Sequence, residues 1–108
     1  MRHRPVDHTT LKNIASIINQ AIAEEKYSLW FVDHAEDRMV DDGIDRIDIV
    51  EVLRDCIISS CRRARWGKWR YVAEGKTLDG LRLAVVVELG EADEEGFDLL
   101  VITVWIIE

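Results

Sequence analysis

The sequence has little cysteine and proline for its length. Two cysteines and one proline occur among 108 residues. Two cysteines cannot form the disulfide framework of a small secreted domain, and the spacing of Cys56 and Cys61 does not match a zinc knuckle. We therefore interpret both as free, buried thiols, one at a helix end and one in a strand.

Long apolar runs and cofactor motifs are also missing. No run reaches the roughly 18 apolar residues that a membrane span needs. The basic start at residues 1–5 is not followed by the apolar core of a signal peptide, which favours a cytoplasmic protein. Residues 1–8 are expected to form a flexible arm, and we expect no metal site at its His3 and His8. Without a phosphate-cradling glycine loop or a nucleophile elbow, no cofactor is expected either.

The chain is acidic, but its charge is unevenly distributed. Residues 1–70 contain 12 Lys and Arg against 12 Asp and Glu, whereas residues 71–108 contain 2 against 9. The net charge of −7 argues against non-specific binding of nucleic acid, although a local basic patch can still bind phosphates. With 48% apolar residues, the chain has enough hydrophobic material for one domain over residues 1–108.

The first half of the chain predicts three helices. Apolar residues recur at helical spacing between Leu11 and Ile22, with Thr9 or Thr10 as the N-cap. Asp33 is predicted to cap a second helix, with Glu36 completing a near capping box, and Gly43 to end it.

A third helix is predicted to start at Asp45, with Asp48 in its first turn. Its inner face is expected to carry four apolar residues, which are Ile47, Val50, Leu53 and Ile57.

The second half predicts antiparallel strands joined by turns. We expect strands over 57–65, 69–74, 81–89 and 99–107, and residues 27–32 form an extended stretch or a short strand. The turns fall at 66–68 and at 78–80, where Asp79-Gly80 is a hairpin signal, and an acidic loop covers 90–96. The chain is thus expected to be an α+β protein, with about three helices packed on an antiparallel sheet of about four strands.

His34 and Arg38 share one face of the second helix, since they are four residues apart. A histidine beside an arginine can act as a general acid or base next to a phosphate clamp. Equally, Arg38 can pair with Asp41 or Asp42 and His34 can satisfy a polar contact at the helix start.

Basic and aromatic residues alternate around the first hairpin, between Arg62 and Arg70. Arg and Lys neutralise phosphates and Trp stacks on bases, so the segment is a candidate RNA-binding surface. On a strand Arg63 and Arg65 share a face, while Arg62 points the other way. The segment can also be a solvated hairpin, or a surface for an acidic protein.

Tyr71 follows Arg70, and Lys76 and Arg82 lie on neighbouring strands. A tyrosine can donate a proton and an arginine can stabilise the charge of a phosphoryl transition state. A tyrosine in a strand is also a common packing residue.

Several short motifs occur together between residues 27 and 107. They are His34-Ala-x-x-Arg38-Met39, Gly43-Ile44, Asp48-Ile-Val-Glu-Val-Leu53, Arg70-Tyr-Val, Gly75-Lys76-Thr-x-x-Gly80-x-Arg82-Leu and Val101-Ile-Thr103-Val-Trp105. With these motifs the chain resembles a bacterial domain family of unknown function in the RelE/ParE-like toxin superfamily. The layout is more distantly similar to MqsR-type mRNA interferases.

The resemblance implies a RelE-like fold and the toxin of a toxin–antitoxin pair, with an antitoxin protein as partner and mRNA as substrate. The RNA 2′-hydroxyl would be the internal nucleophile, so neither a metal nor a protein nucleophile is needed. The expected catalytic residues are His34, Arg38, Arg70 and Tyr71. They are expected to meet where the two halves of the chain join, so that Arg38 approaches Arg70. The expected RNA-binding residues are Arg63, Arg65, Trp66, Lys68, Trp69, Lys76 and Arg82.

The alternative is a non-catalytic protein-binding module, either an antitoxin-bound regulator or an inhibitor encoded by a phage or mobile element. Its acidic surface, from Glu88 to Asp98, would meet a basic partner. The oligomeric state is left open in both hypotheses, a dimer included.

Overall fold

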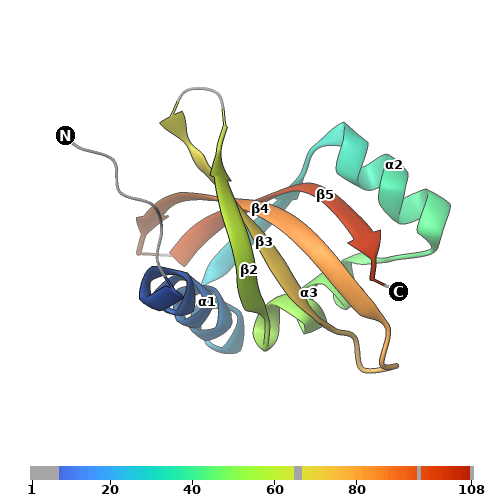
Figure 1. The fold of residues 1–108 in the computed structure, drawn as a ribbon, viewed down its shortest axis with the longest axis horizontal. Coiled ribbons are helices and arrows are strands. Elements are labelled where there is room, and N and C mark those ends of the chain that lie inside the picture. Colours follow the sequence, from blue (N-terminus) through green and yellow to red (C-terminus); the bar gives the residue numbers. More distant parts are fainter. Residues whose placement is uncertain (1–7, 65–66, 95, 108) are drawn as a thin grey trace.

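The computed structural model describes residues 8–64, 67–94 and 96–107, except for the side chains of residues 8, 9 and 91–93. The arm predicted at residues 1–8 lies outside this range apart from His8, which begins the first helix. Within these residues, three helices and a five-stranded sheet confirm the predicted α+β class (Figure 1). None of the described helices is long and apolar enough to cross a membrane.

Helix α1, His8–Ala23, is the amphipathic helix that the apolar spacing predicts. It buries Ala15, Ile18 and Ile22. Thr9 and Thr10 lie inside its first turn, so neither is the N-cap that we predicted.

Helix α2, Asp33–Asp42, begins one residue earlier than we predicted, because Val32 occupies the N-cap and provides no side-chain hydrogen bond. Asp33 is therefore the first helical residue rather than the cap. Gly43 ends the helix as predicted, with a φ of 67° that favours glycine.

Helix α3, Arg46–Arg54, has the predicted start. The Asp45 carboxylate accepts a hydrogen bond from the backbone N–H of Asp48, and the Asp48 carboxylate accepts one from that of Asp45. The predicted inner face is only partly right: Leu53 is buried, but Ile47 is exposed, and Ile57 is an exposed strand residue. Ile49 and Val52 are buried instead.

The strands form one sheet in the order β1-β5-β4-β3-β2. Three neighbouring pairs, β2–β3, β3–β4 and β4–β5, are antiparallel as predicted. Strand β1 pairs with β5 in parallel, so the sheet is mixed and has one strand more than expected. The loop predicted at 90–96 is largely strand, because β4 and β5 extend their ladder to Asp93 and Gly96. The bounds are β1 Tyr27–Phe31, β2 Ile57–Arg63, β3 Trp69–Lys76, β4 Arg82–Asp93 and β5 Gly96–Ile106.

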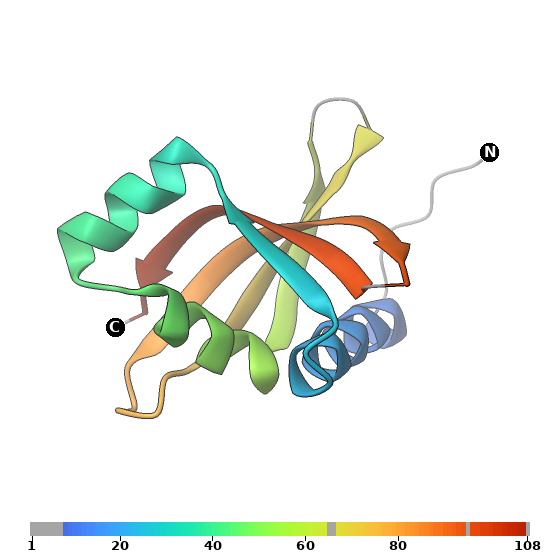
Figure 2. The ribbon, with the colours of Figure 1, turned by 180° about the vertical axis from the view of Figure 1, so that it is seen from behind.

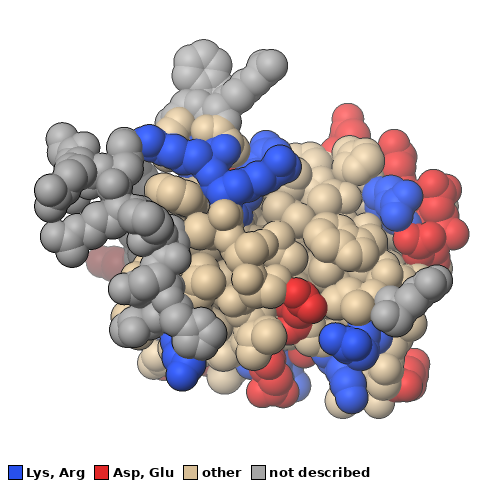
Figure 3. Space-filling view, viewed as in Figure 1, with Lys and Arg blue, Asp and Glu red and all other residues tan. Residues whose placement is uncertain are grey.

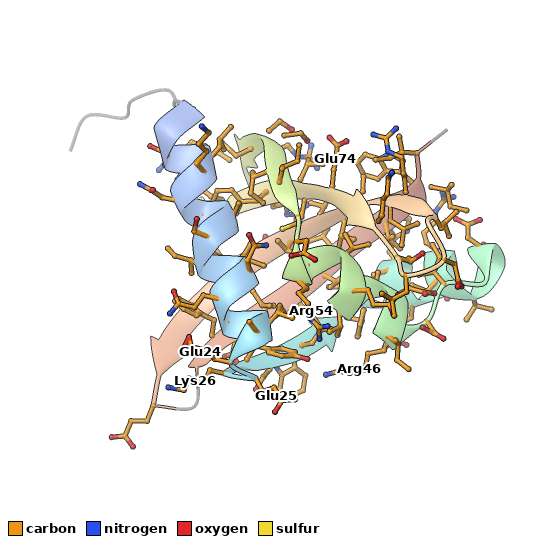
Figure 4. The ribbon with its side chains drawn as sticks, turned by 90° about the horizontal axis from the view of Figure 1, so that it is seen from below. Glu24, Glu25, Lys26, Arg46, Arg54 and Glu74 are labelled. Atoms are coloured by element: carbon orange, nitrogen blue, oxygen red, sulfur yellow. The ribbon has the colours of Figure 1, made fainter. Side chains whose placement is uncertain are left out.

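Helices α1 and α3 lie over the same face of the sheet, in front of it in Figure 4. Between this face and the helices lies the core, which includes Ile49, Leu53, Val85 and Val101. Gly75 of β3 permits the close approach of α3, since a Cβ there would lie 2.9 Å from the Val52 carbonyl oxygen.

Helix α2 leaves the end of β1 and packs against β5, to the side of α3 (Figure 2). It buries Ala35 and Met39. At β1, the Arg46 guanidinium donates a hydrogen bond of 3.2 Å to the Leu29 carbonyl oxygen, which occupies part of this edge of the sheet.

We call the sheet face that points away from α1 and α3 the open face. Its members follow from strand alternation and the pairing register. They are Ser28, Trp30, Ile57, Ser60, Arg62, Arg70, Val72, Glu74, Lys76, Arg82, Ala84, Val86, Glu88, Asp98, Leu100, Thr103 and Trp105.

Both cysteines are free, and Cys56 is 3% exposed just after α3, as the sequence predicts. Cys61 in β2 is only half-buried, so the second prediction is partly wrong. The Asn19 amide donates to the Leu53 carbonyl oxygen at 2.9 Å and approaches the Cys56 sulfur at 3.5 Å, which ties α1 to the end of α3. Burial raises the pKa of the Cys56 thiol from 9.0 to about 11.

This pKa predicts a loss of stability at alkaline pH. The folded state keeps the Cys56 proton while the unfolded state loses it, so the stabilisation is complete below about pH 9 and declines towards pH 11. The decline in the free energy of unfolding is at most ~3 kcal/mol for two pKa units. Urea unfolding across this range should show a flatter dependence in Cys56→Ala than in wild type, and Cys61→Ala is the matched control. Parallel curves for wild type and Cys56→Ala would contradict the expectation.

Candidate functional site

One line of side chains crosses the open face from edge to edge, with one residue from each strand. The register pairs Arg62 of β2 with Arg70 of β3, Arg70 with Glu88 of β4, Glu88 with Leu100 of β5, and Leu100 with Trp30 of β1. We call these five residues the transverse row. It has guanidinium groups at one end, a carboxylate at the centre and an indole at the other end.

The centre of the transverse row is an ion pair. The Nε of Arg70 lies 2.9 Å from Oε1 of Glu88, and the side chains are 30% and 12% exposed. The two terminal nitrogens of Arg70 make no hydrogen bond to a described residue, so they can bind an anion. The pair therefore places a carboxylate beside free guanidinium donors at a partly dry position.

Arg62 lies directly opposite Arg70, and such like-charge neighbours on adjacent strands repel each other. Glu88 offsets one of the two positive charges. A bound anion would offset the other, so this end of the row favours a phosphate.

Sequence reasoning missed Arg62, Glu88 and Trp30 as site residues. Glu88 had a visible signal, because it is the one charged residue in the apolar run from Leu83 to Leu89. Trp30 is 60% exposed, while its neighbour Leu29 is buried. That alternation could have been read from Tyr27-Ser-Leu-Trp-Phe, but the partners across the sheet could not.

His34 and Arg38 lie on exposed positions of α2. The Arg38 guanidinium is 3.8 Å from the carboxylate of Asp42, one of the two structural partners that the sequence suggested. Helix α2 packs mainly against β5, and β4 separates β5 from the strand of Arg70. Arg38 and Arg70 therefore belong to elements that are not neighbours, and their expected approach is not seen.

Tyr71 lies on the opposite sheet face from Arg70. It pairs with Val87 and packs against the core, and burial raises the pKa of its phenol. The four predicted catalytic residues thus do not share one site: Arg70 is on the open face, Tyr71 on the helix face, and His34 and Arg38 on α2.

The basic side chains of the β2–β3 hairpin also lie on both faces of the sheet. Arg63 pairs with Trp69, with its guanidinium 5.8 Å from the centre of the indole, on the face opposite to Arg62 and Arg70. Lys68 is exposed at the hairpin end, whereas Arg65 and Trp66 lie outside the described residues.

Lys76 and Arg82 form a second basic position at the far end of β3 and β4. They are register partners, and neither forms an ion pair with a described residue. They line a shallow hollow of about 360 Å³ together with the carboxylates of Asp55 and Glu74. Among the described residues no group of three or more His, Cys, Asp or Glu could hold a metal ion.

The molecular surface shows how these groups are distributed (Figure 3). Basic side chains gather over the β2–β3 hairpin, and acidic side chains gather over α2. A largely uncharged area lies between them, and further basic side chains lie at its lower edge.

A family model for a domain of unknown function, DUF4258, matches residues 31–106. The chain belongs to this family. The match covers α2, α3 and strands β2 to β5, while α1 and Trp30 precede it. Neither the curated proteins nor the solved structures that were searched gave a significant match.

The geometry predicts that the Glu88 carboxylate destabilises the folded state when Arg70 is removed. Arg70→Met should lower the free energy of unfolding by roughly 1–3 kcal/mol, because it leaves a largely buried carboxylate without its partner. Adding Glu88→Gln should restore most of this loss. A double-mutant cycle by urea denaturation measures the coupling, and additive effects of the two substitutions would show that the pair is not coupled.

Proposed function

We propose that this DUF4258 protein is a metal-independent endoribonuclease that cleaves single-stranded RNA on its open face, as the toxin of a toxin–antitoxin pair. The observation that carries the proposal is the Arg70–Glu88 pair at the centre of the transverse row. It combines a proton acceptor with phosphate-binding groups in one place.

In this reaction Glu88 takes the proton of a ribose 2′-hydroxyl. The 2′-oxygen then forms a bond to the adjacent phosphorus while the bond from phosphorus to the 5′-oxygen breaks. The leaving 5′-oxygen receives a proton from the Glu88 carboxylic acid or from water. The products are a 2′,3′-cyclic phosphate and a 5′-hydroxyl, so atoms and charge balance without a protein nucleophile.

Arg70 and Arg62 supply the charge that the phosphate needs. Two guanidinium groups beside the reacting phosphorus stabilise the additional negative charge of the transition state. In this proposal Glu88 replaces His34 and Tyr71 as the group that moves the proton, because neither of these shares a face with Arg70.

The toxin assignment rests on the resemblance to RelE/ParE-like toxins together with the observed helix-plus-sheet fold. Fold alone does not fix function. A cognate antitoxin would be the protein partner, and it would block growth inhibition by covering the open face.

The alternative of a binding module uses the acidic surface predicted from Glu88 to Asp98. Glu88 itself contributes little to such a surface, because it is 9% exposed and pairs with Arg70. In that segment, the exposed carboxylates that the structure describes belong to Glu94 and Asp98.

The decisive variant is Glu88→Gln, which keeps an acceptor for Arg70 but cannot take a proton. We expect it to lower RNA cleavage by roughly 10²–10⁴-fold, with 2′,3′-cyclic phosphate ends detected in the wild-type products. His34→Ala is the matched control and should cleave normally.

Full activity of Glu88→Gln, together with a loss in His34→Ala, would move the site to α2. Absence of RNA cleavage by wild type, with no effect of Arg70→Ala on growth inhibition, would overturn the nuclease proposal.

Lys76 and Arg82 are expected to hold a phosphate away from the cleaved bond. Replacing both by Gln should weaken RNA binding at low salt and reduce the slope of log K against log salt by about 0.7 per lost contact. Lys12→Gln with Lys26→Gln, on α1 and before β1, is the control for a change of the same net charge. An equal effect of both double variants would indicate only long-range attraction.

A further inference from the structure

Trp30 is an unusual residue for its position. It lies in a hydrogen-bonded strand and is nevertheless 60% exposed, although tryptophan is highly buried on average. Its strand neighbours Leu29 and Phe31 point to the helix face and contribute to the core, so Trp30 is not needed there. Tryptophan is enriched at binding interfaces, so we treat this exposed indole as a candidate binding residue.

The surroundings of Trp30 suggest what it binds. Its register partner Leu100 is half-buried and gives an apolar neighbour, and the next residue in the row is Glu88. Two inter-strand spacings, or roughly 10 Å, separate the backbones of Trp30 and Glu88. A nucleotide adjacent to a phosphate held at Arg70 can reach this far with its base.

We propose that Trp30 is a stacking platform for an unpaired base next to the cleaved phosphate, so that single-stranded RNA crosses the strands along the transverse row. This inference rests on the proposed function of Arg70 and Glu88. The sugar–phosphate chain binds at the guanidinium end, and a base lies on the indole at the other end. Stacking on an aromatic ring requires an unpaired base, so a double helix would not use this subsite.

The other two tryptophans that the structure describes, Trp69 and Trp105, do not offer the same combination. Trp105 is also on the open face and is 38% exposed, but its register partner is Ala84, which in turn pairs with Glu74. That row contains no guanidinium, because it has Glu74 where the transverse row has Arg70 and Ile57 where the transverse row has Arg62. Trp69 contacts Arg63 on the opposite face. Trp105 is therefore a matched control for Trp30.

The test measures binding of a short oligoadenylate to Glu88→Gln protein, which prevents cleavage during the titration. Adding Trp30→Ala should weaken binding by about 5–150-fold, the fold-change that corresponds to one base–aromatic stack. Trp30→Phe should retain most of the affinity, and Trp105→Ala should stay within about twofold of its parent. An oligonucleotide that is abasic at the stacked position should bind the Trp30→Ala protein and its parent equally.

The possible failures can be told apart. If Trp30→Ala binds RNA normally while Arg70→Ala does not, the stacking subsite is wrong and the RNA site stands. If the parent binds no RNA, the proposed function falls and the stacking subsite with it. If Trp30→Ala leaves RNA binding unchanged but abolishes capture of a co-expressed antitoxin, Trp30 is a protein-binding residue and the stacking proposal is overturned.

Discussion

The stability of the fold depends on the packing of α1 and α3 against one face of the five-stranded sheet. Leu83, Val85 and Val87 of the central strand β4 are fully buried on that face, and they alternate with residues of the open face. Burial of this kind is the dominant favourable contribution to folding. Because these helices cover only one side of the sheet, every second residue of β3, β4 and β5 lies on the open face and does not pack against α1 or α3.

The open face is where the sequence departs from what stability alone would select. Replacing a buried ion pair with packed apolar residues is often neutral or stabilising, so a buried pair is weak evidence of a structural role. The Arg70–Glu88 pair lies within an otherwise apolar strand, and Arg62 opposite Arg70 adds a repulsion. Trp30 is exposed in the same row. Three locally unfavourable choices in one line are best explained by a ligand that satisfies them together.

Features fixed by neighbouring residues could be predicted from the sequence. The amphipathic spacing of α1, the capping box at Asp45 and the glycine that ends α2 at Gly43 all depend on contacts within a few residues. The predictions at Asp33 and Ile47 were wrong by only a residue or two. They failed because tertiary packing decides at which residue a helix begins and which of its sides is buried.

The candidate site could not be predicted in this way. Its residues come from five strands, and which side chains meet depends on register and on the bulges at Ser59 and Ile102. A shift of one residue would place Tyr71 instead of Arg70 on the open face. The sequence also gave no sign that β1 would add to β5 in parallel, which is what brings Trp30 into the row. Grouping residues by type along the chain therefore joined His34 and Arg38 of α2 with Arg70 and Tyr71 of β3, and the fold places these on a separate helix and on two different faces of the sheet.

The central claim is that RNA binds across the open face, along the transverse row. Amide and side-chain NMR shifts of isotope-labelled Glu88→Gln protein, titrated with a short single-stranded RNA, test it most directly. The account predicts that the largest changes fall at Arg62, Arg70, Leu100 and the Trp30 indole, while α1 and α3 stay unchanged. Changes concentrated on α2 around His34 and Arg38, with an unaffected open face, would contradict it.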